Sequence, residues 1–184
     1  NDLLIGGEGA DVLHGNDSND LLIGSLTIFD DDQASLDSIS TVWNSDDDYT
    51  TRVSTIRTGS GPILNDVKLE ANTTVLDDGI SDELAGGEGR DWFFAHQEMD
   101  HLKDKNSDEE LDLVVSVVGD IDRNGVLDAD DIDLLYGQIS GNVGPVDSRF
   151  DLVPDGMIDQ QDVDRLVHDI MGREYGDANL DGRI

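Results

Sequence analysis

The chain has 184 residues, of which 43 are Asp or Glu and 11 are Lys or Arg, so its formal net charge is −32. A charge this negative repels nucleic acid and anionic membrane surfaces, and neither is expected as a partner. The sequence has no cysteine, which excludes disulfides and thiol chemistry, and no apolar run reaches the roughly 18 residues of a membrane span. Only 36% of the residues are hydrophobic, so we expect cations to neutralise a chain that would otherwise resemble disordered proteins.

A period of nine residues marks the beginning of the sequence and returns after residue 78. Each unit has an acidic residue at its sixth place and an apolar residue at its eighth place. The sixth-place acids are Asp2, Asp11, Asp20, Asp82, Asp91, Asp100 and Glu109. The eighth-place residues are Leu4, Leu13, Leu22, Leu84, Phe93, Leu102 and Leu111. The pattern predicts a tight turn over the first six places and a three-residue strand whose middle side chain points inward.

These units match the nonapeptide G-G-x-G-x-D-x-U-x and resemble the calcium-binding parallel β-rolls of the repeats-in-toxin (RTX) family. Stacked turns place Asp2 and Asp20 on one side of the roll and Asp11 on the other. Calcium takes roughly six to eight oxygen ligands, which carboxylates and turn carbonyls supply. The expected ligands are Asp2, Gly7, Gly9, Asp11, Asp17, Asp20, Asp82, Gly87, Gly89, Asp91 and Asp100. The alternative, a Gly/Asp-rich loop without metal, does not explain the fixed inward leucines.

Residues 25 to about 72 interrupt the repeats with a helical pattern. Apolar residues at helical spacing follow the aspartates at 30–32 and at 46–48: Leu36, Ile39, Val42 and Trp43, then Tyr49, Val53 and Ile56. Aspartate favours the residue that caps a helix N-terminus, and Gly59 is a stop signal. We predict two short amphipathic helices, which form a hairpin inserted between turns of the roll.

The chain is expected to return to the roll through residues 72–79. Val75 falls in the eighth-place register, but Thr73 stands where the sixth-place acid should be. A roll turn without an ion is therefore predicted there.

Two aromatic residues, Trp92 and Phe94, flank the inward Phe93 and should point outward from a strand. Left exposed, they would form an apolar patch. We expect the inserted helices or the following module to cover them. An aromatic platform that binds carbohydrate or a protein partner is the alternative.

Residues 120–131 match the twelve-residue calcium loop of the EF-hand. Its places one, three, five, six, nine and twelve are held by Asp120, Asp122, Asn124, Gly125, Asp128 and Asp131. At place seven, Val126 offers its backbone carbonyl. We expect this loop to bind calcium.

A second copy begins 31 residues later, at Asp151. Its expected ligands are Asp151, Asp155, Met157 through its carbonyl, Asp159 and Asp162. Val153 stands at place three, where a carboxylate or amide should coordinate, so a lower affinity is expected. A third, truncated loop offers Asp177, Asn179 and Asp181 and stops before places nine and twelve.

Helical patterns follow the two complete loops, at about 129–139 and 160–171, whereas a strand-like stretch at 113–118 precedes the first. Tandem loop-helix units with aspartate at place twelve resemble the dockerin family. The resemblance implies contact with a cohesin-type partner through places ten and eleven. Those places hold Ala129, Asp130, Gln160 and Gln161 instead of the hydroxyl pair common in that family.

The expected fold class is α+β. Residues 1–116 are predicted to form an RTX-like parallel β-roll with the helical insertion, and residues 117–184 an α-helical, dockerin-like EF-hand module. The combination resembles the C-terminal part of large secreted or cell-surface bacterial proteins. It implies several bound Ca²⁺ ions, an extracellular location and a structural, adhesive or anchoring role, with a cell-surface component as a further possible partner.

Two other functions stay open at this point. One is an accessory tail of a secreted hydrolase, and the other, less favoured, is an intracellular calcium sensor. Neither HExxH nor Gly-x-Ser-x-Gly nor a phosphate-binding loop with its lysine occurs in the sequence. No catalytic residue is therefore proposed, and the chain is not expected to be an enzyme.

Overall fold

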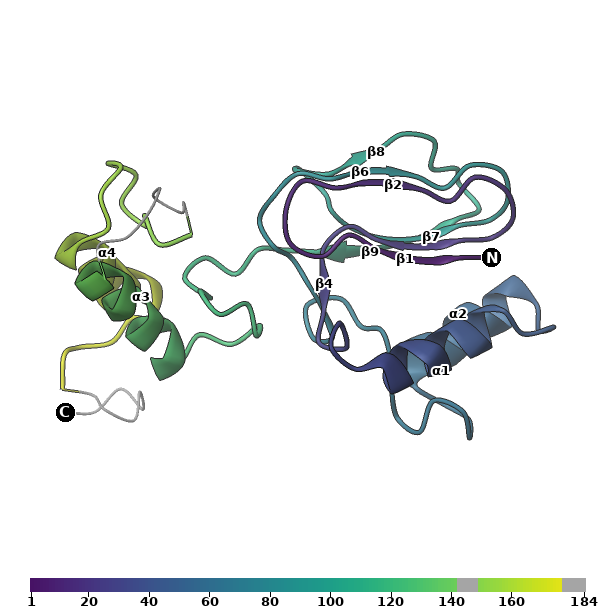
Figure 1. Cartoon of the computed structure of the whole chain (residues 1–184), viewed down its shortest axis with the longest axis horizontal. Helices are drawn as coiled ribbons and strands as arrows, with labels where there is room; N and C mark the ends of the chain where they lie inside the picture. The colour runs from purple at the N-terminus through teal and green to yellow at the C-terminus, as the bar shows by residue number, and fades with distance from the viewer. Residues whose placement is uncertain (142–148, 177–184) are drawn as a thin grey trace. The chain divides into compact units, whose positions relative to one another are not determined.

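The computed structural model describes residues 1–141 and 149–176 and divides the chain into two compact units, Asn1–Ser116 and Val117–Ile184 (Figure 1). The described chain is mixed α+β, with parallel sheets in the first unit. Within those two ranges, none of the helices combines the length and apolar character needed to span a membrane. The predicted ligands of the third loop, Asp177, Asn179 and Asp181, lie outside the described residues.

The nonapeptide strands of the first unit form two parallel sheets. One sheet has the order β1-β3-β7-β9 and the other β2-β6-β8, so successive repeat strands alternate between the sheets and the chain winds as a roll (Figure 1). The strands of the first sheet are β1 (Leu3–Ile5), β3 (Leu21–Ile23), β7 (Trp92–His96) and β9 (Glu110–Val114). Those of the second are β2 (Val12–His14), β6 (Glu83–Ala85) and β8 (His101–Leu102).

The turns between the sheets form two stacks. The first turn stack contains residues 6–11, 77–82 and 97–100, and the second contains 15–20, 86–91 and 104–109. Asp2 precedes β1 and therefore belongs with Asp20 in the second stack, whereas Asp11 lies in the first. The predicted separation of these aspartates is confirmed.

The interior of the roll consists of the eighth-place side chains. Leu22, Leu84 and Phe93 are fully buried there. The partly buried residues that pack against them are Leu4, Leu13, Leu102 and Leu111. The prediction that the eighth-place residue points inward is thus confirmed in every unit. Its two neighbours on the strand face the opposite side, because successive side chains of a strand alternate between the faces of a sheet.

The insertion forms the predicted pair of helices, α1 (Gln33–Trp43) and α2 (Tyr49–Thr58). Asp32 caps α1, where its carboxylate accepts the N–H groups of Ala34 and Ser35. Asp48 caps α2 in the same way, through the N–H group of Thr51. Gly59 ends α2 in the left-handed conformation, with φ of 65°, which a residue without a Cβ atom adopts readily.

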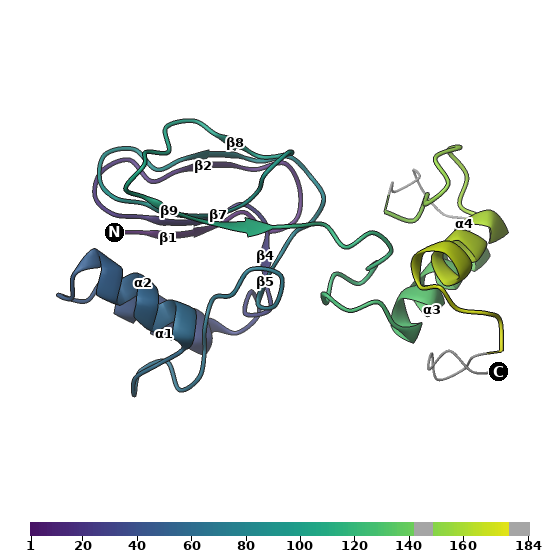
Figure 2. The same ribbon diagram turned by 180° about the vertical axis from the view of Figure 1, so that it is seen from behind.

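Both helices cover the outer face of the sheet that contains β3 and β7 (Figures 1 and 2). Trp92 and Phe94 have no exposed surface, and the ring centroids of Trp92 and Trp43 lie 6.1 Å apart. The expectation that the insertion covers these rings is confirmed. The alternative of an exposed aromatic platform is wrong, because the aromatic faces form the hydrophobic core between the insertion and the roll.

The return of the chain to the roll differs from the prediction. Val75 lies in β5 (Val75–Leu76), which pairs antiparallel with β4 (Leu26–Thr27). Val75 is buried in the core beneath the helices, outside the row of eighth-place side chains. The prediction of a roll turn ending at Val75 is wrong, because the β4-β5 ribbon closes the base of the insertion.

The second unit contains α3 (Ala129–Gly141) and α4 (Gln160–Asp164), and α4 continues as the π-helix η1 (Arg165–Ile170). Its core consists of Ile121, Leu135, Phe150, Val163, Leu166 and Val167. The predicted helices after both loops are confirmed, although the second changes to π geometry. The strand predicted over 113–118 is wrong beyond Val114: β9 ends there, and Val115 and Val118 are exposed.

Replacing Trp43 by alanine should loosen the insertion. The variant loses a fully buried ring, so we expect the free energy of unfolding to fall by about 3–5 kcal/mol in urea unfolding followed by circular dichroism, in excess calcium. Thr41→Ala, on the exposed side of the same helix, should change it by less than about 0.5 kcal/mol. Similar small effects in both variants would contradict a packed interface.

Candidate metal centres

The sixth-place aspartates form a ladder between successive turns. In the second turn stack, the N–H group of Asp2 donates to Oδ1 of Asp20 (2.5 Å), and the N–H group of Asp20 donates to Oδ1 of Asp91 (2.7 Å). In the first turn stack, two bonds of 2.9 Å run in the same way, from the Asp11 N–H group to Asp82 Oδ1 and from the Asp82 N–H group to Asp100 Oδ1. One oxygen of each accepting carboxylate is therefore fixed by the neighbouring turn.

The second oxygen of four of these aspartates is buried and has no hydrogen-bond partner. These atoms are Oδ2 of Asp11, Asp20, Asp82 and Asp91. Asp20 and Asp91 are fully buried, and Asp82 is 1% exposed. An ionised oxygen without a partner in such an environment is costly unless a cation compensates it. The row of oxygens therefore has the chemistry of a cation site.

Glycine at the first place keeps space open in front of these oxygens. A Cβ atom on Gly15 would lie 2.5 Å from Asp20 Oδ2 and 2.5 Å from the carbonyl oxygen of Gly86 in the next turn. A Cβ atom on Gly24 would lie 2.9 Å from Asp82 Oδ2. Carboxylate and carbonyl oxygens thus converge where a side chain is missing, which fits a hard cation such as calcium.

Positive φ angles shape the same turns at the second and fourth places. The four predicted glycine ligands adopt them: Gly7 at 86°, Gly9 at 113°, Gly87 at 96° and Gly89 at 140°. Between these turns, Asn16 and Ser18 adopt φ angles of 72° and 87° at the equivalent places. The conformation belongs to the turn itself, because side-chain residues adopt it too, at a cost that glycine avoids.

Burial raises the pKa values of the ladder carboxylates. The pKa of Asp82 rises to about 7, first because of burial and then because of the like charges on Asp100, Asp78 and Asp11. Burial likewise raises the pKa of Asp91 to about 6. Without a cation, ionisation of these buried carboxylates near neutral pH therefore lowers the stability of the folded state.

Two predicted ligands of the roll are not buried with the others. Asp2 and Asp17 are both exposed. The backbone of Asp17 forms an isolated parallel bridge with Glu88, which leaves its side chain on the solvent side of the turn. The structure therefore does not place the Asp17 carboxylate in the row of buried oxygens.

The last turn of the second stack contains a cation of its own, which the sequence analysis missed. Lys105 Nζ donates to the carbonyl oxygens of Asn106 (2.9 Å) and Glu109 (3.0 Å). Asp104, in the first place, accepts the N–H groups of Gly86 (3.0 Å) and Gly87 (2.9 Å). The signal in the sequence is the replacement of both glycines by a charged pair at places one and two.

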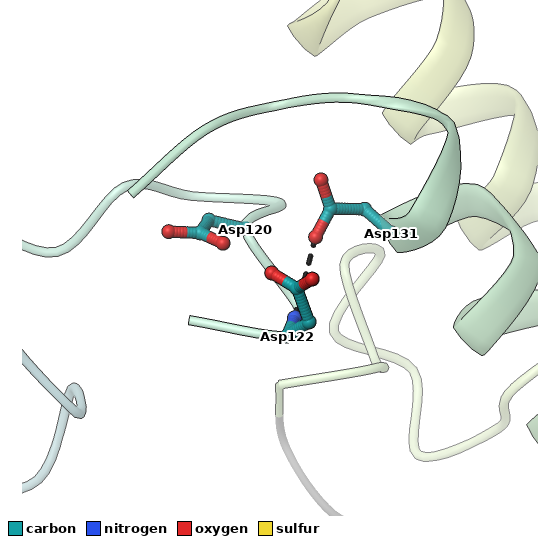
Figure 3. Close-up of side chains that lie close together, drawn as sticks. All are labelled: Asp120, Asp122 and Asp131. Carbon is teal, nitrogen blue, oxygen red and sulfur yellow. Dashed lines mark hydrogen bonds between the residues drawn. The ribbon is translucent and has the colours of Figure 1, made fainter. Parts of the chain in front are cut away.

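In the second unit, three carboxylates of the loop at residues 120–131, which was predicted to be an EF-hand loop, gather in one place (Figure 3). Asp120, Asp122 and Asp131 each offer an oxygen, and these oxygens all lie within 4.8 Å of one another. Asp131 is fully buried, and its carboxylate accepts the N–H groups of Ile121 (2.7 Å) and Asp128 (2.9 Å). The place-twelve residue therefore ties the two ends of the loop together.

Hydrogen bonds within the loop also fix the side chains of other predicted ligands. Asp120 Oδ2 accepts the N–H group of Gly125 (2.8 Å), whose φ of 82° makes the sharp turn at place six. Asn124 Oδ1 accepts the N–H group of Val126 (2.7 Å). Asp128 Oδ1 accepts that of Asp130 (2.8 Å). Burial is the main cause that raises the pKa values of Asp120 and Asp131.

The second loop repeats this geometry with one side-chain ligand fewer, because Val153 replaces the residue at place three. The carboxylate of Asp162, which is 1% exposed, accepts the N–H groups of Val153 (2.9 Å) and Asp159 (2.8 Å), and Asp151 accepts that of Gly156 (3.0 Å). Asp155 accepts the N–H group of Met157 (2.9 Å), and Met157 itself is exposed. Because calcium prefers oxygen ligands, the group that Met157 offers is its backbone carbonyl. Val153 adds no oxygen from its side chain.

Comparison with known proteins bears on the first unit. No curated protein and no solved structure matches the chain. Repeats of the RTX type bind calcium in a structural, typically non-catalytic role, and RTX repeat proteins are typically secreted by bacteria. Residues 1–26 match the family model of the RTX calcium-binding nonapeptide repeat (4 copies), which supports calcium as the cation of the N-terminal turns.

Proposed function

We propose that this chain is a non-catalytic, extracellular module of a secreted bacterial protein and that calcium ions drive its folding. The observation that carries the proposal is the row of buried Oδ2 atoms without hydrogen-bond partners on Asp11, Asp20, Asp82 and Asp91. Ions that bind only the folded form stabilise it by mass action. Sites with dissociation constants of ~10⁻⁴ to 10⁻³ M would be filled in calcium-rich extracellular fluid and empty in the cytosol.

The charge of the chain gives calcium a second effect. At a net charge of −32, compaction brings like charges together and is opposed by their repulsion. Each divalent ion in a turn cancels two of those charges at the place where they are closest. Calcium is therefore proposed to act both as a ligand-bound crosslink and as a counterion.

For the second unit, we propose a dockerin-like pair of EF-hand loops that bind the same ion. The support is the oxygen cluster of Asp120, Asp122 and Asp131, and the same loop hydrogen bonds around Asp151 and Asp162. The two loops share one hydrophobic core within the second unit. A structural or anchoring role follows for the chain as a whole, because both units would become rigid in the same compartment.

Removal of calcium should unfold the protein. In excess chelator at neutral pH we expect most of the β and helical circular dichroism signal to disappear. Addition of calcium should restore the signal, because bound ions relieve the repulsion between the ladder carboxylates. Magnesium at the same concentration serves as control and should restore less, since it dehydrates reluctantly and demands octahedral geometry. A spectrum that is insensitive to chelator would contradict the proposal.

Acid should partly replace calcium. The folded-state pKa values of Asp82, about 7, and Asp91, about 6, lie above the ordinary value of 3.8, so the native state binds more protons than the unfolded state. Their contribution to stability is present below about pH 4 and is lost as the pH rises through 6 and 7. Calcium-free protein should therefore regain part of its circular dichroism signal between about pH 8 and pH 5.

The same titration with excess calcium is the control for this prediction. Protons compete with calcium for the same oxygens, so the increase in melting temperature on adding calcium should be larger at the higher pH. Calcium-free protein that loses structure on acidification would show that these carboxylates are not buried in the native state.

The two EF-hand loops should differ in their sensitivity to substitution. Asp120→Ala removes a carboxylate from a complete oxygen cluster, whereas Asp151→Ala acts on a loop that already lacks a ligand at Val153. We expect calorimetry to show the larger loss of calcium affinity for Asp120→Ala. The control is Asp133→Ala, which removes an exposed charge from α3. Equal losses at positions 120 and 151 would contradict this ranking.

A further inference from the structure

The insertion divides one turn of the first stack into two segments. Gly24 and Ser25 leave β3 and stack on the first turn, where the N–H group of Gly7 donates to the carbonyl oxygen of Ser25 (3.1 Å). Residues 77–82 complete the turn on the other side of the insertion, and Asp78 Oδ2 accepts the N–H group of Gly9 (2.8 Å). One roll turn is therefore assembled from chain ends that are separated by residues 26–76.

Buried oxygens from both segments lack partners at this split turn. Asp82 Oδ2 is buried without a partner and lies 2.9 Å from the position of a Cβ atom on Gly24. Oδ2 of Asp100, from the next turn, lies 3.3 Å from the same position and accepts the N–H group of His96 (2.7 Å). Ser25, which is 2% exposed, has a hydroxyl without a partner. Two carboxylates thus point at the space above Gly24, next to an unpaired hydroxyl.

Asp77 adds a third carboxylate beside Ser25, because the antiparallel pairing of Leu26 with Leu76 brings these two flanking residues together. Its Oδ2 accepts the N–H group of Gly79 (3.0 Å) and the hydroxyl of Ser116, whereas its Oδ1 is buried and has no partner. After burial, the like charge of Asp77 is among the causes that raise the pKa of Asp100, so the two carboxylates interact. In an uninterrupted repeat, this position would hold the first glycine of the nonapeptide.

The following turn, residues 97–100, is unlike the glycine-rich turns. It contains no glycine, and positive φ angles are absent from its four residues. The oxygens that lie nearest to the missing Cβ atom of Gly24 belong to side chains, those of Asp82 and Asp100.

We propose that the split turn binds a calcium ion through the carboxylates of Asp77, Asp82 and Asp100 and the hydroxyl of Ser25. This inference rests on the proposed function, from which it takes calcium as the ion, and it assigns Asp77 and Ser25 as ligands outside the repeat pattern. Because Ser25 and Asp77 flank residues 26–76, the ion fastens the two ends of the insertion together. Without it, three like charges, those of the buried Asp82 and Asp100 and the half-buried Asp77, force those ends apart.

The test combines an ion count with local amide exchange. Native mass spectrometry of the full chain in calcium should show one ion fewer for Asp77→Asn than for the wild type. Hydrogen exchange should become faster in peptides from residues 26–76, while peptides from β3 and β7 keep their protection. The matched control, Asp46→Asn, removes an exposed charge from the insertion and should change neither measurement.

Ser25→Ala provides a second, neutral variant in case Asp77→Asn does not fold. We expect it to weaken the binding of one calcium ion about tenfold in calorimetry, with the other ions unaffected. Unchanged affinity in Ser25→Ala, or a wild-type ion count and wild-type exchange in Asp77→Asn, would overturn the inference and leave the proposed function standing. A wild-type chain that binds no calcium would instead overturn the proposed function, and the split-turn site with it.

Discussion

The structure of the first unit depends on carboxylates that are buried in stacked turns. Asp20, Asp82, Asp91 and Asp100 each accept a backbone N–H group of a neighbouring turn through one oxygen, which holds the turns in register. The same burial leaves the other oxygen without a partner in Asp20, Asp82 and Asp91. The alignment of the turns and the buried negative charge therefore have the same origin, because the carboxylates that accept these hydrogen bonds are themselves buried. Under the proposed function, a calcium ion at these oxygens completes the turn, and repulsion between the carboxylates opens it when the ion is absent.

The inserted helices give the roll a second core and connect it to the ladder. The roll interior is only one row of side chains wide, whereas the core under α1 and α2 contains Trp43, Trp92 and Phe94. At its edge, the hydroxyl of Tyr49 donates to the carbonyl oxygen of Asp91 (2.7 Å). Burial raises the pKa of Tyr49 to about 12, so the donor keeps its proton. A residue of the apolar interface thus forms a hydrogen bond with a turn that contains buried carboxylates.

Local regularities of the sequence predicted most of this architecture. The period of nine places Leu22 and Phe93 inside the roll, and the capping aspartates Asp32 and Asp48 mark the helix starts, because these signals act within a few residues of the chain. The path of Val75 was not predictable in this way, since its pairing with Thr27 depends on residues 48 positions apart. The roles proposed for Asp77 and Ser25 were hidden for the same reason, because the two residues are 52 positions apart and meet only through the pairing of Leu26 with Leu76.

The turns also differ in what can neutralise their carboxylates, and this difference depends on whether glycine stands at the first place of the turn. Where glycine opens the first place, as at Gly15 and Gly24, oxygens of two turns converge on an empty space. Where the first two places are Asp104 and Lys105, the chain supplies an ammonium group that two carbonyls of the turn accept. An internal ammonium group is present at any calcium concentration, whereas an ion is present only in a suitable compartment. The turn that precedes β9 is therefore fastened by hydrogen bonds from a lysine of the chain itself. Under the proposed function, the glycine-rich turns instead fold only where calcium is available.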